Sequence, residues 1–222
     1  MFDDFFEILK KKPLREQIVE KSVESLLLGK QMFMDAKTSL RSDGNLDFAR
    51  HVIEEDKIIN KSERSIRRKL LTHFALADNV DIGSGFAISS IVIDIERIGD
   101  YAKNIADLAL LTEGNLNIRP FEDTVKIIEE KIESMFDNTV AAFEKDDDDL
   151  AKAVMAMYKE GISNQCEAIK DSLIREDVKI PKKDAVSIAL YVRSLKRVGA
   201  HLYNICSSII NPFPRIGFKA KE

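Results

Sequence analysis

The chain has 222 residues, of which 45% are hydrophobic and 32% are charged, and its formal net charge is −4. It is long enough to bury a full core, as one domain or two small ones, and its composition excludes an intrinsically disordered chain. The mild acidity argues against general nucleic-acid binding, because that role usually requires a basic surface that displaces counterions.

The cysteines and the apolar segments indicate the compartment. Cys166 and Cys206 form no CxxC pair and no disulfide framework, which is typical of a reducing environment. The first six residues lack the basic-then-apolar layout of a signal peptide. The longest apolar stretch, residues 85–93, is far shorter than the roughly 20 residues that a membrane span needs. We therefore expect a cytoplasmic protein that meets a membrane only through a partner or a surface helix.

Apolar periodicity and helix breakers predict a wholly helical chain, because alternating strand patterns are absent. The expected helices are residues 13–41, 46–76, 81–111, 120–145, 150–175 and 181–210. The segment 112–115 lies at the centre of the chain and is its clearest hinge. We predict an all-α fold of two tandem three-helix bundles, 1–113 and 114–222, with antiparallel helices because the connections are short.

An internal repeat supports this division. Residues 95–105 recur, altered, as residues 195–205, an offset of 197 − 97 = 100. The third helix has apolar residues at the 3-4-3-4 spacing of a packed helix seam: Ile88, Ile91, Ile95, Ile98, Ala102, Ile105 and Ala109. All seven positions that lie 100 residues later are also apolar or aromatic: Ile188, Tyr191, Leu195, Val198, Leu202, Ile205 and Ile209. One helical unit has therefore been used twice.

A polar stripe borders the first of these seams. Glu96, Asp100 and Asn104 are spaced four residues apart, and Asp56 interrupts the apolar series of the preceding helix. If the two helices pack side by side, Asp56 approaches Glu96 and Asp100. Such carboxylates repel one another and need a proton, a basic partner or a hard cation. The donor types suit Mg, Mn, Ca or Fe better than a structural zinc ion.

The same spacing is also common on solvated helix faces. There, Arg97 or Lys103 would neutralise the acids and no metal would be needed. Asp94 points about 200° away from Glu96 around the helix, which indicates a polar or partner-facing position. The second copy lacks the acids, because Lys196 and Ala200 stand where the first copy has Glu96 and Asp100.

Residues 94–106 resemble the Asp-x-Glu-Arg-Ile-Gly-Asp-x-x-x-Asn-Ile-Ala signature of the PhoU family of phosphate-uptake regulators. The pattern around Val52 and Asp56 resembles the second helix of that family, and Asp81 matches an acid before its third helix. The likeness covers most of the chain, because the family consists of two tandem three-helix repeats. It implies a non-enzymatic, cytoplasmic regulator, expected to be a homodimer. The expected partners are the ATPase of a phosphate ABC transporter and a membrane histidine kinase.

The resemblance also implies a metal site. Family members bind multinuclear metal clusters through a Glu/Asp-x-x-x-Asp motif on each repeat. Carried over to this chain, the ligands are Glu96 and Asp100, with Asp56 and Asn104 as neighbours. The cofactor would be one or several ions of Fe, Mn, Zn or Mg. Arg97 would orient the acids through a charge-assisted hydrogen bond.

This sequence departs from the family pattern in the second repeat. With Lys196 and Ala200 in place of the acids, a metal cluster there is not expected. Glu160 lies near the place that Asp56 holds in the first repeat, and we hypothesise that Lys196 pairs with Glu160. Gly83 also stands where the family often has Arg, which leaves a partner contact at that position without its usual cation.

A helical chain with these acids has two alternative functions. A carboxylate-bridged metal oxidase would use Glu-x-x-His pairs, and none of the three histidines stands three residues after a Glu. His51, His73 and His201 are instead predicted to lie at the surface or at an interface. The second alternative is a structural dimerisation module that binds no metal.

Overall fold

The computed structural model describes residues 14–41, 45–76 and 81–219. The long helices of the first half are α2 (Leu14–Arg41), α3 (Asp47–Leu76) and α4 (Ile82–Thr112). Those of the second half are α5 (Glu122–Lys145), α6 (Asp148–Met157), α7 (Asn164–Ile174) and α8 (Lys182–Ile210). A π-helical turn, η1 (Tyr158–Ser163), joins α6 to α7, and a short 3₁₀ turn, η2 (Phe213–Arg215), follows α8. The predicted all-α fold is confirmed for these ranges, although the expected start at Pro13 lies outside them.

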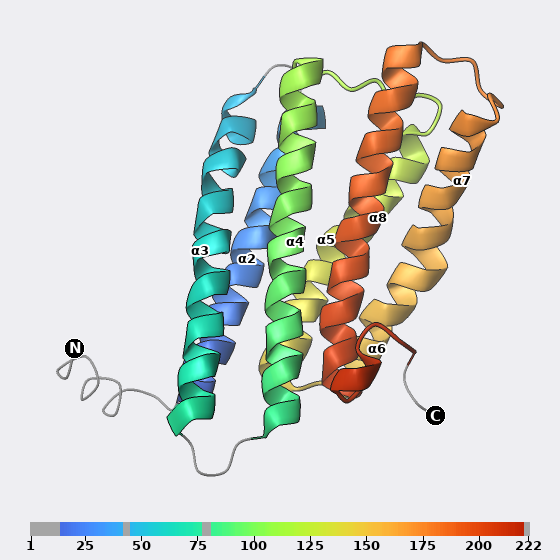
Figure 1. The fold of residues 1–222 in the computed structure, drawn as a ribbon. Helices are drawn as coiled ribbons and strands as arrows, with labels where there is room; N and C mark the ends of the chain where they lie inside the picture. Colours follow the sequence, from blue (N-terminus) through green and yellow to red (C-terminus); the bar gives the residue numbers. More distant parts are fainter. Residues whose placement is uncertain (1–13, 42–44, 77–80, 220–222) are drawn as a thin grey trace.

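The helices run alternately up and down (Figure 1). Helices α2 and α4 of the first repeat and α5 and α8 of the second lie in the middle of the molecule. Helix α3 flanks this group on one side, and the α6–α7 segment flanks it on the other. Each repeat is thus an antiparallel three-helix bundle, and the two bundles pack against each other through four helices.

Side-chain and backbone caps explain where the helices begin and end. Asp81 precedes α4 and accepts a hydrogen bond from the Ser84 backbone N–H, as a typical N-cap residue does. Glu113 ends the same helix in the left-handed conformation, at φ 58°. Asp147 accepts hydrogen bonds from two backbone N–H groups at the start of α6. The acidic run 146–149 is therefore a helix terminus.

The predicted fifth helix, 150–175, differs from the structure because the π-helical turn interrupts it. Gly161 lies in this turn, and α5 passes so close that a Cβ there would be 2.4 Å from Lys131 Nζ. The turn also places Tyr158 and Ile162 against Gly199 of α8. Glycine is a poor helix former, and a π turn inserts one residue into a helix without breaking it. The interruption is set by these tertiary contacts, which apolar periodicity does not reveal.

The predicted seams form the core. In α4, the residues from Ile91 to Ala109 on the seam are buried, and Ile88 is partly buried. In α8, the residues from Ile188 to Ile205 on the seam are buried, and Ile209 is partly buried. The main hydrophobic cluster contains residues of both repeats, so the two bundles share one continuous core. A smaller cluster fills the far end of the first repeat: Ile18, Ile66, Leu70 and Val92.

Polar contacts also join the repeats along α2 and α5. Glu129 of α5 is buried, and its Oε1 lies 3.2 Å from Arg41 Nε of α2. The Tyr191 hydroxyl of α8 donates to the same oxygen at 2.5 Å. Lys37 and Glu133 form a further ion pair between α2 and α5. Burial raises the pKa of Glu129, while Tyr191 and Arg41 oppose that shift by stabilising the carboxylate.

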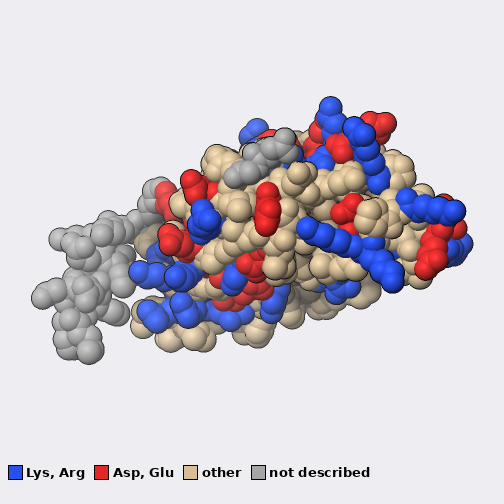
Figure 2. Space-filling model, turned by 90° about the horizontal axis from the view of Figure 1, so that it is seen from above, with Lys and Arg blue, Asp and Glu red and all other residues tan. Residues whose placement is uncertain are grey.

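The surface is charged and mixed. Viewed from above, Lys and Arg side chains lie among Asp and Glu side chains (Figure 2). Among the described helices, none has a stretch that is both long enough and apolar enough to cross a bilayer.

Candidate functional site

The predicted site lies where α3 packs against α4, and Asp56 is its buried member. Asp56 is only 6% exposed. Its Oδ2 accepts a hydrogen bond from Lys103 Nζ at 3.0 Å and one from Asn60 Nδ2 at 3.2 Å. The bond to Asp56 raises the pKa of Lys103. Lys103 is therefore held as a cation, and it supplies the positive charge that a buried carboxylate requires.

Glu96 and Asp100 are half-buried on the adjoining face of α4. Arg97 donates from its NH1 nitrogen to Asp100 Oδ2 at 2.8 Å, and its Nε lies 3.5 Å from Glu96 Oε2. One guanidinium thus contacts both predicted ligands. This is the geometry expected of an orienting arginine, and equally that of an ion pair on a solvated face.

Around Glu96, the effect of the neighbouring acids and of burial is larger than that of the neighbouring base. Burial raises the pKa of Glu96, and the charges of Asp100, Glu63 and Asp56 raise it further, while Arg97 opposes the shift. Four carboxylates from two helices therefore act on one another despite the nearby bases. Glu63 was not among the predicted ligands, although it interrupts the same apolar series of α3 as Asp56.

The predicted ligands do not converge on one point. In the described part of the chain, Asp56, Glu96 and Asp100 do not form a group whose ligand atoms all lie within 4.8 Å of one another. Asn104 is exposed. The carboxylate donors suit a hard cation, but an ion would have to replace Lys103 at Asp56 and Arg97 at Asp100. The metal site of Asp56, Glu96, Asp100 and Asn104 therefore stays a prediction.

Asp94 lies on a different face of α4, as its position around the helix predicted. It is 9% exposed and points to α8. Its Oδ1 lies 2.7 Å from His201 Nδ1 and accepts a hydrogen bond from Asn204 Nδ2 at 3.0 Å. Asp94 therefore joins the two repeats. Sequence reasoning did not identify these partners, although it placed His201 at the surface or an interface.

A second polar contact adjoins this one. The Tyr101 ring of α4 stacks on the His201 ring, with 5.7 Å between the centroids. Arg197 of α8 donates from Nε to the Tyr101 hydroxyl at 3.1 Å. Tyr101 and His201 hold equivalent positions in the two copies, so the α4–α8 contact brings equivalent positions together. The residue types that fill this contact differ between the copies.

In the second repeat, the predicted pair of Lys196 with Glu160 is wrong. Lys196 Nζ pairs with Glu167 of α7, and Glu160 is exposed. The π-helical turn contains Glu160 and shifts the rotational phase of the helix after it, so Glu167 faces α8 instead. Hydrogen bonds from Lys170 and Lys196 lower the pKa of Glu167 to about 2. Lys196 does place a cation on this face, but the side chain is partly exposed and pairs with a different acid.

The fold and these contacts define a class: a duplicated three-helix-bundle protein with an acidic face on one copy. A family model described as the PhoU domain matches residues 23–109 and 125–209. The chain belongs to the PhoU family, and the resemblance inferred from its motif is confirmed.

Relatives and solved structures agree. The chain is 32% identical over 182 residues to a "Phosphate-specific transport system accessory protein PhoU homolog" of Pseudomonas putida, covering 79% of this chain and 70% of the relative. A protein of the same name from Pseudomonas aeruginosa is 30% identical over 173 residues, covering 76% and 71%. The crystal structure of PhoU from Pseudomonas aeruginosa superposes with a TM-score of 0.80 at 27% identity, covering 89% of this chain and 95% of that one. PhoU from Streptococcus pneumoniae, at a TM-score of 0.73, 21% identity and the same coverage, supports the fold.

Proposed function

We propose that this chain is an accessory regulator of a phosphate-specific transport system and acts by binding, not by catalysis. The observation that carries this proposal is the family match, which extends over both repeats. Two relatives, matched over 70% and 71% of their own length, carry the name of a phosphate-specific transport system accessory protein. A duplicated helical bundle with mixed-charge surfaces is suited to contacts between protein surfaces.

The proposed partners are cytoplasmic or face the cytoplasm. They are the ATPase of a phosphate ABC transporter and the membrane histidine kinase that reports on phosphate supply. We propose that the chain meets them as a homodimer. Binding to either partner would shift that partner between active and inactive states through a difference in affinity for the two states.

The proposed regulatory ligand is a hard or borderline cation on the α3–α4 face. Glu96 and Asp100 would hold it, with Asp56 and Asn104 beside it. Burial raises the pKa of Glu96, and the charges of Asp100 and Asp56 raise it further against the opposing charge of Arg97. This supports the proposal, because a cation would relieve the repulsion among the acids. Binding would release Lys103 and Arg97 from their carboxylates. The two freed bases would change the charge pattern that a partner meets.

The ion pairs of Lys103 and Arg97 also favour the alternative of a metal-free dimerisation module. In that case the acids are neutralised within the protein and no ion takes part. The two possibilities differ in whether removal of Glu96 and Asp100 changes metal uptake.

Phosphate uptake in living cells tests the proposed function. A bacterial strain without its own PhoU would express this chain, and uptake of radioactive phosphate would be compared in phosphate-rich and phosphate-poor medium. We expect the chain to restore the reduction of uptake in rich medium. The Glu96→Ala/Asp100→Ala variant should lose this response. Glu130→Ala/Glu144→Ala, which removes two exposed carboxylates of α5, should keep it. Uptake that is the same with and without the wild-type chain would contradict the proposal.

A further inference from the structure

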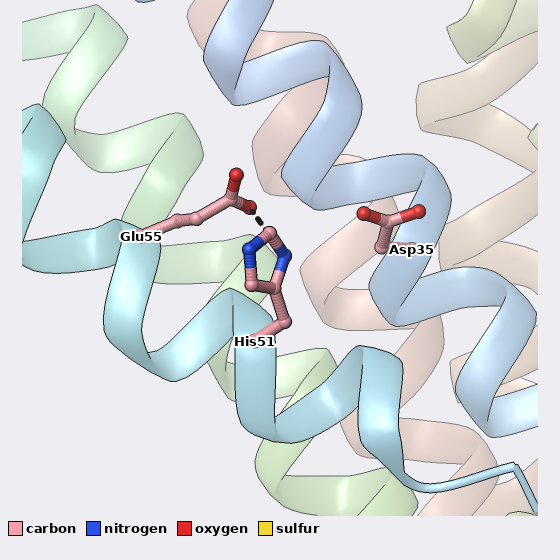
Figure 3. Close-up of side chains that lie close together, drawn as sticks. All are labelled: Asp35, His51 and Glu55. Atoms are coloured by element: carbon pink, nitrogen blue, oxygen red, sulfur yellow. Dashed lines mark ion pairs between the residues drawn. The ribbon is translucent and has the colours of Figure 1, made fainter.

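A second cluster of potential metal ligands lies on another face of α3, which faces α2. Asp35 comes from α2, and His51 and Glu55 come from α3, where they are four residues apart on one helix face (Figure 3). One ligand atom from each residue lies within 4.8 Å of the other two. In the described part of the chain, this is the one group of at least three potential metal ligands that lie this close together.

The cluster is separate from the α3–α4 face. Glu55 and Asp56 are neighbours in sequence, but consecutive residues on an α-helix point about 100° apart. Asp56 is directed to Lys103 of α4, whereas Glu55 lies beside His51 and Asp35. An ion bound by one set would not share ligands with the other.

In the described part of the chain, the base paired with this cluster is its own His51, whose Nδ1 lies 3.6 Å from Glu55 Oε2. Within the described ranges, neither Asp35 nor Glu55 forms an ion pair with Lys or Arg. Glu55 Oε2 is buried and has no hydrogen-bond partner, and the Glu55 side chain is only 12% exposed. A buried carboxylate oxygen without a donor requires a partner, and a cation would supply one.

The separation of His51 and Glu55 suits a small metal ion. His51 Nδ1 lies 3.6 Å from Glu55 Oε2. Two ligands of a tetrahedral zinc ion, with bonds of about 2.1 Å, are about 3.4 Å apart. The His51 side chain is 59% exposed, so it is free to adjust and leaves an open side for a water ligand. One imidazole nitrogen and two carboxylate oxygens are a donor set that zinc accepts.

We propose that Asp35, His51 and Glu55 bind one Zn²⁺ ion between α2 and α3. The ion ties the two helices together near the end of the bundle where they are joined. The thiols do not compete for it, because Cys166 and Cys206 are buried and burial raises the pKa of each to about 12.

Isothermal titration with Zn²⁺ at neutral pH tests this site. The full chain would carry Glu96→Ala/Asp100→Ala, so that failure here is independent of the α3–α4 face. We expect one Zn²⁺ per chain. Glu55→Gln should weaken binding by more than about tenfold, since removing even an outer partner of a ligand costs about 10- to 100-fold. Glu54→Gln, a neighbouring exposed residue with the same change of charge, should bind as the parent does.

Imidazole NMR signals provide a second readout. The chain has three histidines, and His51→Gln identifies the signals of His51 by their disappearance. One equivalent of Zn²⁺ should shift the His51 signals and leave those of His73 and His201 in place. Unmoved His51 signals would overturn the proposal. Equal affinity in Glu55→Gln and Glu54→Gln would overturn it as well.

Discussion

The two repeats have the same apolar seam. The charged side chains beside that seam are neutralised differently in each repeat. In the first repeat, Glu96 and Asp100 lie near Asp56, and Arg97 and Lys103 provide the positive charge from neighbouring positions. In the second, Lys196 stands at the position of Glu96 and pairs directly with an acid of α7. At this border the second repeat pairs its cation with an acid, while in the first repeat burial and neighbouring acids raise the pKa of Glu96. This difference is the basis for proposing a cation on the first repeat.

The α4–α8 contact also differs between the repeats, because Asp94 has no acidic counterpart 100 residues later. Removing the Asp94 carboxylate should have the largest effect on the free energy of unfolding. Asp94→Ala should lower the free energy of unfolding by about 2–3 kcal/mol, because buried His201 and half-buried Asn204 lose their acceptor. The position 100 residues later is Ser194, whose hydroxyl bonds only to the Leu190 carbonyl of its own helix. Ser194→Ala should cost less than about 0.5 kcal/mol. Urea denaturation measures both, and equal losses would show that Asp94 does not join the repeats.

Charge reversal at the second-repeat border should have an intermediate effect. Lys196→Glu removes a partner of Glu167 and places two acids together, which should cost about 1 kcal/mol because these side chains are partly exposed. Glu167 has a lowered pKa, so the stabilisation is present above pH 4.5 and is lost as pH falls toward about 2. The difference between wild type and variant should shrink in 1 M salt. Identical denaturation curves at neutral pH and low salt would argue against the pair.

Neutralising Glu96 should change the stability least. It should raise the free energy of unfolding, whereas the two changes above lower it. Because the pKa of Glu96 is raised in the folded state, its charge destabilises the protein at neutral pH. Glu96→Gln should therefore stabilise the metal-free protein at pH 7, by less than about 1 kcal/mol. The gain should shrink as pH falls through the raised pKa, because wild-type Glu96 then takes up a proton and loses its charge. Melting curves in chelator across this range would detect it, and a loss of stability at pH 7 would contradict the charge surplus.

Much of the fold could be predicted because it depends on local rules. The 3-4-3-4 seams gave the buried faces of α4 and α8, and Asp81 marked a helix start through its capping side chain. The π-helical turn could not be predicted, because it depends on the approach of α5 at Gly161 and of α8 at Gly199. The turn changes which residue after it faces α8. Without it, the sequence indicated Glu160 instead of Glu167 as the partner of Lys196.

The candidate sites were only partly predictable for the same reason. Spacing placed Glu96 and Asp100 on one face and Asp94 on another, because these residues share a helix. Contacts between helices need the rotation of each helix about its axis, which a single sequence does not specify. The pairing of Asp94 with His201 and the approach of Asp35 to His51 both depend on such rotations.

Metal uptake tests the central difference between the repeats most directly. Equilibrium dialysis with Mn²⁺ would use the full chain carrying His51→Gln, so that the α2–α3 cluster does not contribute. We expect bound Mn²⁺ in this protein and in its Glu130→Ala/Glu144→Ala derivative, and none above background in its Glu96→Ala/Asp100→Ala derivative. Equal Mn²⁺ uptake by all three proteins, or none by any of them, would contradict a cation site on the acidic face of the first repeat.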